Sequence, residues 1–328
     1  MIRRREFITL LGGVAAALPV GARAQQPAMP VIGYLYSGEL ETSAPWTAAF
    51  RKGLSEAGYD EGCNVTIEYR WAHNEPARLP ELAADLVRRR VAVIVAPGTV
   101  AAVRAAKAAT STIPIVFRTG GDPVALGLVP SLNQPGGNIT GINAMSLETS
   151  TKRLGLLHEL LPGAARFAVL VNLNDSNADY YTKDLKAAAS TIGRQIEFLG
   201  AGNNREIDVA FAGLAQRRPD GLLVVSQGLF TNRRLQIVTH ATRLALPGIY
   251  PQREFAEIGG LVSYGSSSID QYRLTGVYAG RVLKGEKPAV MPVLRASKFE
   301  LVINLQTAKV FGVDIPSTLL AAADEVIE

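Results

Sequence analysis

The sequence predicts an α/β fold of two lobes, each a doubly wound parallel sheet with helices on both faces. Short apolar runs alternate with segments of helical periodicity, which is the pattern of parallel sheets. Several runs are continuously apolar, as expected for strands that are buried on both faces. The alternation runs through the chain twice over similar lengths, and about 300 residues suit two domains better than one.

The first series supplies the elements of lobe 1. β-branched and aromatic residues predict strands at 31–36, 65–71, 91–96 and 113–117. Apolar residues at helical spacing predict helices at 44–57, 79–90, 99–109 and 124–132. The turn Pro135-Gly136-Gly137 closes this series.

The second series supplies the elements of lobe 2. Strands are predicted at 167–171, 196–199, 221–225, 247–250 and 261–264. Helices are predicted at 177–192, 207–216, 231–244 and 269–283, the last of which ends at Gly285.

The first 24 residues have the order of a cleaved export signal. A basic start at 3–5 is followed by a short apolar stretch at 9–20 and by Ala22-Arg23-Ala24, a small-residue cleavage site. The apolar stretch is too short for a permanent membrane anchor, so no stable membrane insertion is expected. Arg4-Arg5 resembles the twin-arginine signal, and an ordinary Sec signal is the alternative. We expect a mature chain that begins at Gln25 in the periplasm.

Composition excludes several classes of function. Outside the signal the chain carries 30 basic and 28 acidic residues, a net charge of +2, with no basic stripe that would bind nucleic acid. Cys63 is the only cysteine, so no internal disulfide can form. We expect a monomer that is held together by packing alone.

Ligands of open parallel α/β sheets bind beyond the carboxyl ends of the strands, so the residues there are the candidates. They combine helix caps that favour anions, aromatic walls and polar side chains. The predicted ligand-binding residues are Tyr36, Ser37, Trp46, Gly98, Thr99, Asp122, Asn172, Ser226, Gln227, Tyr250, Glu254 and Tyr264. The alternative is that the polar residues only cap their own helices and that the aromatic rings only pack at the rims.

Charged residues near these ends suggest the chemistry of a ligand. Asp122 and Glu254 could bind an amine, while Arg118 and Arg253 could bind a carboxylate. Each arginine has an alternative partner within the chain. Arg118 could pair with Asp122, and Arg253 with Glu254 or Glu257.

Recognised catalytic motifs are missing from the sequence. His158-Glu159 begins like a zinc-binding helix but has Pro162 where the second histidine is required. There is no G-x-S-x-G turn, no P-loop and no G-x-G-x-x-G after the first strand. We therefore expect neither enzyme activity nor a metal or cofactor.

Seven stretches carry a resemblance to a known family, at 68–72, 113–117, 121–129, 132–141, 253–256, 259–265 and 298–305. The chain resembles the periplasmic substrate-binding proteins of ABC transporters, in the subgroup related to tryptophan- and tyrosine-type binding proteins. This resemblance implies a type I periplasmic-binding-protein fold with a hinge and a ligand cleft between the lobes. It implies three chain crossings, near 139–143, 264–266 and 292–297. Lobe 1 would comprise 31–141 plus 265–292, and lobe 2 would comprise 142–264 plus 293–328.

The resemblance implies the solute-binding component of an ABC import system. It would capture a small molecule, an aromatic amino acid or related carboxylate, by lobe closure and deliver it to a permease and its ATPase in the inner membrane. Two alternatives remain open. One is a ligand sensor for a membrane signalling partner, and the other is a periplasmic enzyme that uses Asp122, Asp175 or Glu254 as acid or base.

Overall fold

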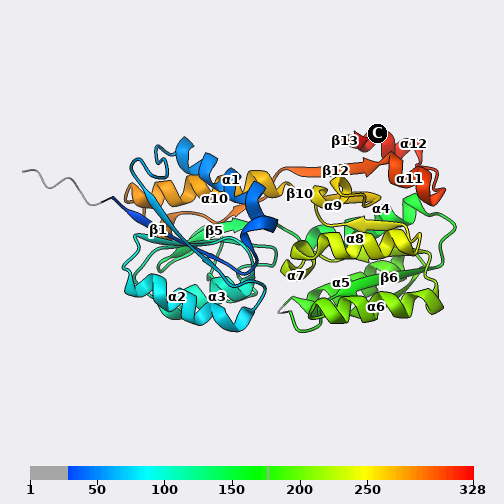
Figure 1. Ribbon diagram of the computed structural model, residues 1–328, viewed down its shortest axis with the longest axis horizontal. Coiled ribbons are helices and arrows are strands. Elements are labelled where there is room, and N and C mark those ends of the chain that lie inside the picture. The colour runs from blue at the N-terminus through cyan, green and yellow to red at the C-terminus, as the bar shows by residue number, and fades with distance from the viewer. Residues whose placement is uncertain (1–28, 176) are drawn as a thin grey trace, which may run out of the picture.

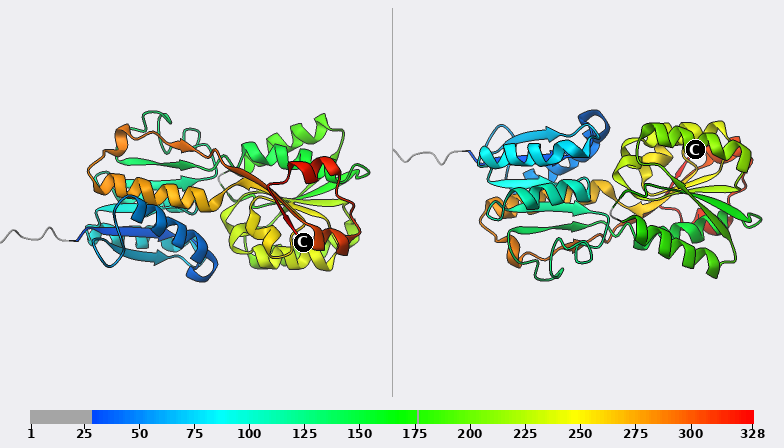
Figure 2. Two further views of the ribbon diagram at one scale, coloured as in Figure 1. Left: turned by 90° about the horizontal axis from the view of Figure 1, so that it is seen from above. Right: turned by 90° about the horizontal axis from the view of Figure 1, so that it is seen from below.

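The computed structural model describes residues 29–175 and 177–328 (Figure 1). The predicted export signal at 1–24 lies outside the described residues. Within the described ranges, none of the helices has the length and apolar character that a membrane span requires. Two lobes lie side by side along the long axis of the molecule, each a sheet between helices (Figures 1 and 2).

Lobe 1 is built on a six-stranded sheet in the order β11-β5-β4-β3-β1-β2, in which every described pair is parallel. Its strands are β1 (Val31–Tyr36), β2 (Thr66–Trp71), β3 (Val93–Ala96), β4 (Ile115–Thr119), β5 (Ile139–Asn143) and β11 (Leu294–Arg295). The helices are α1 (Leu40–Glu56), α2 (Leu79–Arg88), α3 (Val100–Ala109) and α10 (Ser268–Leu283). Short 3-10 turns lie at Pro76–Arg78 and Pro288–Val290.

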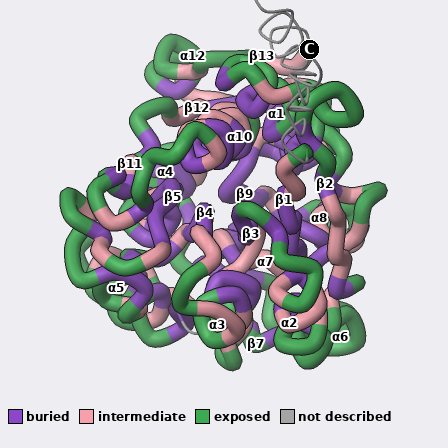
Figure 3. Tube along the Cα trace, turned by 90° about the vertical axis from the view of Figure 1, so that its left-hand side faces the viewer, coloured by how far each residue is buried: buried purple, intermediate pink, exposed green. Residues whose placement is uncertain are grey.

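The sheet of lobe 1 buries a separate hydrophobic cluster on each face. Tyr34 packs with residues of α1 and α10, while the next residue, Leu35, packs with residues of α2 and α3. Successive side chains of a strand point to opposite faces, so continuously apolar strands need helices on both sides. The buried segments run through the centre of the lobe, as the tube coloured by burial shows (Figure 3).

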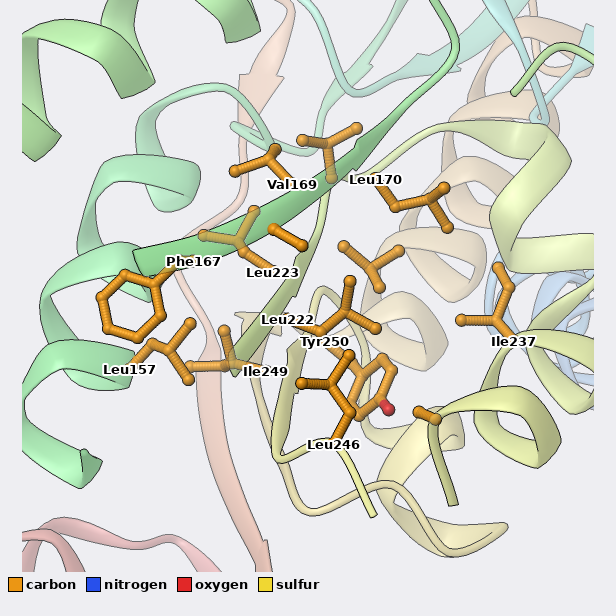
Figure 4. Close-up of a cluster of buried hydrophobic side chains, with 14 of the residues drawn as sticks. Leu157, Phe167, Val169, Leu170, Leu222, Leu223, Ile237, Leu246, Ile249 and Tyr250 are labelled. Atoms are coloured by element: carbon orange, nitrogen blue, oxygen red, sulfur yellow. The ribbon is translucent and has the colours of Figure 1, made fainter. Parts of the chain in front are cut away.

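Lobe 2 is built on a seven-stranded sheet in the order β13-β12-β10-β9-β8-β6-β7. Its strands are β6 (Arg166–Val171), β7 (Gln195–Gly200), β8 (Gly221–Val224), β9 (Gly248–Tyr250), β10 (Val262–Ser266), β12 (Phe299–Asn304) and β13 (Glu325–Ile327). The helices are α4 (Glu148–Leu160), α5 (Ala178–Thr191), α6 (Asn204–Arg217), α7 (Gly228–Asn232), α8 (Arg234–Arg243), α9 (Arg253–Glu257), α11 (Leu305–Phe311) and α12 (Ser317–Ala322). Central strands and helices share a continuous core that includes Phe167, Leu222 and Ile249 (Figure 4).

Three segments join the two sheets, at residues 144–147, 267 and 296–298. They are bonded to one another. The Ser267 N–H donates to the Lys298 carbonyl at 3.0 Å, and the Ala296 N–H donates to the Asn143 carbonyl at 2.8 Å. The Ser266 hydroxyl donates to the Ala144 carbonyl at 2.7 Å. These contacts make the crossings one hinge region, while the lobe boundaries themselves stay a prediction.

The structure confirms the predicted two-lobed fold and corrects two of its details. The predicted helix at 124–132 is wrong, because this segment forms turns between Pro123 and Pro130, with Gly127 at φ 68°. Proline and a left-handed residue both disfavour a continuous helix. The sheet of lobe 2 is also not wholly parallel, since β12 pairs antiparallel with β10.

Candidate functional site

A cavity of about 50 Å³ lies between the lobes, beyond the carboxyl ends of strands from both sheets. Lobe 1 contributes residues that follow β1, β3 and β4, together with Trp46 of α1 and Tyr272 of α10. Lobe 2 contributes residues that follow β6, β8 and β9. This is the edge at which open parallel sheets bind ligands.

The wall from lobe 1 presents hydrogen-bond donors. Thr99 caps α3, since its hydroxyl oxygen accepts the Ala102 N–H at 3.4 Å, and the helix begins at the cavity wall. The buried guanidinium of Arg118 donates from Nε to Gln271 Oε1 at 2.5 Å. Arg118 forms no salt bridge with a carboxylate in residues 29–175 and 177–328. A guanidinium and a helix N-terminus both favour an anionic group.

Aromatic rings form a second part of this wall. The rings of Trp46 and Tyr272 are stacked, with centroids 5.7 Å apart and planes at 17°. The Arg118 guanidinium lies 5.2 Å from the centroid of the Tyr272 ring. Tyr36 also lines the cavity and packs edge-on against Trp71. Such faces suit a flat or apolar part of a ligand.

The wall from lobe 2 presents hydrogen-bond acceptors. Desolvation raises the pKa of the Asp175 carboxyl, and the backbone N–H of Asn177, which donates to it at 2.9 Å, partly offsets this. The side-chain oxygens of Asn177 and Gln252 are buried at the cavity and accept no hydrogen bond from the described residues. Buried acceptors without a partner are costly, so this wall is suited to a ligand with several N–H donors.

Gln227 ties together two of the loops that form this wall. Its Oε1 accepts the Asn172 N–H at 2.7 Å, and its Nε2 donates to the Asn172 carbonyl at 3.1 Å. The Tyr181 hydroxyl, from α5, donates to the Ser226 carbonyl at 2.7 Å. The loops after β6 and β8 are thus held in place by side chains, which fixes the positions of the acceptors.

The structure brings most of the predicted site residues together. The ones that line the cavity are Tyr36, Ser37, Trp46, Gly98, Thr99, Ser226 and Gln227. Asn172 borders a neighbouring cavity of about 340 Å³ between the same lobes. The two cavities share Thr99 and Asp175 among their lining residues. Whether these residues bind a ligand stays a prediction.

The remaining four predicted residues lie outside the cavity wall. Asp122 is exposed and accepts the Val124 N–H at 2.8 Å, so it caps its own turn. Tyr250 lies in the core of lobe 2 (Figure 4), where it stacks on Phe255. Tyr264 is in strand β10 at the hinge, stacked on Phe299. Glu254 is buried behind the wall, where its Oε1 accepts a hydrogen bond from Trp46.

The alternative partners of the two arginines are also resolved. Arg253 pairs with Glu257 at 2.8 Å, as one of the sequence alternatives proposed, and also with Glu300 and Glu325. Arg118 instead bonds Gln271 and faces the cavity. Among the residues that the structure describes, no cluster of three or more His, Cys, Asp or Glu side chains could hold a metal ion.

Several residues of the cavity were not among the sequence candidates. They are Val100, Gly120, Ser146, Asn177, Gly228, Thr231, Asn232, Gln252 and Tyr272. Asn177 lies six residues after β6 ends, so a search for ligand-binding residues in the whole loop after each strand would have included it. Tyr272 is on the helix that follows the hinge, so no pattern along the chain associates it with the strand ends.

Comparison with known proteins gives consistent matches along most of the chain. Residues 44–327 match the family described as ABC transporter substrate binding protein. A tyrosine-binding protein of Clostridioides difficile (strain R20291) is 29% identical over 264 residues, which cover 79% of this chain and 74% of that protein.

Solved structures show the same fold. A conserved domain protein from Vibrio cholerae has a TM-score of 0.83 at 26% identity, and a Streptococcus pneumonia domain in complex with L-Trp has 0.82 at 24%. A ligand-free, open substrate-binding protein from Clostridium difficile has 0.66 at 26%. Each covers 91% of this chain and 99% of its own. At equal coverage the ligand-free, open structure has the lowest TM-score of the three.

The matched residues include the three hinge crossings and every residue that lines the cavity except Tyr36 and Ser37. The chain belongs to the family of ABC transporter substrate-binding proteins.

Proposed function

We propose that this chain is the periplasmic solute-binding component of an ABC import system and that it captures a zwitterionic aromatic amino acid. The observation that carries this proposal is the division of the cavity. Arg118 and the start of α3 face it from lobe 1, whereas Asp175 and the amide oxygens of Asn177 and Gln252 face it from lobe 2. An α-amino acid carries the complementary pair of charges.

The proposed binding mode follows from the two walls. The ligand carboxylate would bind Arg118 and the N–H groups at the start of α3, and the ammonium would bind Asp175. The aromatic ring would lie against Trp46 or Tyr272. The cavity of about 50 Å³ has room for about four water molecules, so the ligand would extend into the neighbouring cavity of about 340 Å³. A tyrosine-binding protein and a domain in complex with L-Trp are among the relatives of this chain, which supports this ligand class.

Binding and transport would use the hinge. A ligand that touches both walls stabilises the arrangement in which the lobes meet, because its two ends are satisfied only there. The closed form would then dock on a membrane permease that an ATPase drives. Export by the predicted signal would place the mature chain in the periplasm, where such receptors act.

Truncated ligands test the division of the cavity. We expect L-tyrosine and L-tryptophan to raise the melting temperature of the mature protein. At a ligand concentration one hundred times Kd, the free energy of unfolding should rise by about 2.7 kcal/mol. Tyramine lacks the carboxylate and 3-(4-hydroxyphenyl)propionate lacks the amine, so each should stabilise much less. Equal stabilisation by all four compounds would show that the protein recognises neither the carboxylate nor the amine of the ligand.

Recovery of the bound compound tests whether the protein is a receptor or an enzyme, and uptake by cells tests its role in import. A receptor should return L-tyrosine unchanged after prolonged incubation, whereas conversion to another compound would favour an enzyme. Cells that lack the gene should lose uptake of radiolabelled L-tyrosine and regain it with the wild-type gene but not with Arg118→Gln. Unchanged uptake after deletion would contradict a role in import.

A further inference from the structure

We propose that Trp46, Glu254 and Arg234 form a latch across the cleft that holds the two lobes together, independently of which small molecule is bound. Trp46 belongs to α1 of lobe 1, while Arg234 begins α8 and Glu254 lies in α9 of lobe 2. The Trp46 indole Nε1 donates to Glu254 Oε1 at 2.7 Å. Both residues are buried, with exposed fractions of 2% and 8%.

Arg234 holds the same indole from a second direction. Its guanidinium lies 5.5 Å from the centroid of the Trp46 ring, a cation–π distance. Its Nη2 also donates to the Thr42 carbonyl of α1 at 3.2 Å. The start of α1 is therefore bonded to lobe 2 by two side chains from different helices, and both contacts would break if the lobes separated.

The burial of Glu254 makes the contact sensitive to its partner. Its second carboxylate oxygen, Oε2, is buried and accepts no hydrogen bond within the described ranges. A buried carboxylate with one donor depends heavily on that donor, so removing the Trp46 N–H leaves it unpaired. Separation of the lobes would expose the Glu254 carboxylate and the Trp46 N–H to water, so their hydrogen bond forms only when the lobes are together.

Other contacts between the lobes lie closer to solvent. The Asn232 Nδ2 donates to Asn74 Oδ1 at 2.5 Å, and Arg233 lies 3.9 Å from Glu39 with both side chains about one third exposed. Exposed ion pairs at this distance contribute little. The Trp46–Glu254 bond is thus the buried polar contact on which closure depends most, and it acts on a ring that also lines the ligand cavity.

Spin-label distances in the ligand-free protein test the latch. Cys63 is exposed and would be replaced by serine, after which labels are attached at Glu81→Cys on α2 and Arg205→Cys on α6. These exposed positions are in opposite lobes, so the label distance reports the opening of the cleft. The protein is measured with native Glu254 and with Glu254→Ala, Glu254→Gln and Glu257→Ala.

We expect native Glu254 to give a short-distance population, and Glu254→Ala to lower the ratio of short to long distances about tenfold, as expected for loss of a hydrogen bond to a charged group. Glu254→Gln keeps an acceptor oxygen for Trp46 and should retain most of the short population. Glu257→Ala is the matched control on the same helix, because Glu257 pairs with Arg253 of its own lobe.

Two results would overturn the latch: no short-distance population with native Glu254, or equal distributions for Glu254→Ala and Glu257→Ala. If Glu254→Ala does not fold, Trp46→Phe removes the donor instead and should give the same tenfold loss. Because no ligand is present, a failure of L-tyrosine to bind would leave the latch standing. Normal L-tyrosine binding with unchanged label distances would contradict the latch alone.

Discussion

Arg118 and Asp175 illustrate how single residues determine the chemistry of the cleft. Arg118 is in β4 of lobe 1, one position before the strand ends, and Asp175 is in the loop after β6 in lobe 2. They face one cavity only because the lobes meet there. Sequence reasoning named Arg118 as a possible partner of a ligand carboxylate, and Asp175 only as an acid or base of the alternative enzyme. It could not tell that Arg118 would bond Gln271 rather than Asp122, because Gln271 is distant along the chain.

Replacing Arg118 should weaken ligand binding. We expect Arg118→Gln to raise the Kd for L-tyrosine about tenfold to a hundredfold, since a charge-assisted hydrogen bond is lost. Titration calorimetry measures this. Arg281→Gln is the control, because Arg281 pairs with Glu286 and lines neither cavity. Equal effects of both changes would contradict the assignment of the carboxylate to Arg118.

Glu254 should make stability depend on pH. Desolvation raises the pKa of its carboxyl above the ordinary 4.5, against the opposing effects of Trp46 and Arg234, while Glu257 adds to the rise. A raised carboxyl pKa means that stability is fully present below the unfolded-state value and is lost as pH rises through the folded-state value. Glutamine cannot titrate, so the melting temperature of Glu254→Gln should rise relative to that of wild type as the pH is raised above the ordinary carboxyl value of 4.5. A difference that does not change with pH would contradict this.

At the scale of elements, the packing of α1 on α10 depends on two glycines. A Cβ added at Gly53 would clash with the Arg273 carbonyl, and one at Gly276 would clash with the Phe50 carbonyl. Backbone therefore meets backbone between these helices, which brings Trp46 and Tyr272 within stacking distance. Helical spacing predicted both helices, whereas nothing in either sequence segment predicts that they cross so closely.

Gly53→Ala should destabilise the protein by about 1–3 kcal/mol, because the added methyl overpacks a backbone contact. Gly155→Ala in α4 is the matched control, since nothing lies within 4 Å of its added Cβ. That change should be neutral or stabilise by up to about 1 kcal/mol. Urea unfolding measures both free energies. Equal free energies for the two variants would show that the helices can move apart without cost.

At the scale of the molecule, the two-lobed fold was predictable because the alternation of strands and helices restarts in mid-chain. The antiparallel strand β12 was not, because it follows the third hinge crossing and an apolar run does not show in which direction a strand pairs. The sequence predicted that residues at the strand ends would bind a ligand, but not which of these residues would line one cavity. Which ends meet depends on how the lobes are placed, and three bonded crossings decide that.

The most direct measurement of the central claim is a calorimetric titration of the mature protein with L-tyrosine and L-tryptophan. The two divided walls predict saturable binding of one molecule per chain by at least one of them, with Kd near or below about 1 μM, and a loss of affinity in Asp175→Asn. Absence of saturable heat from both amino acids at about 1 mM would contradict the proposed ligand class.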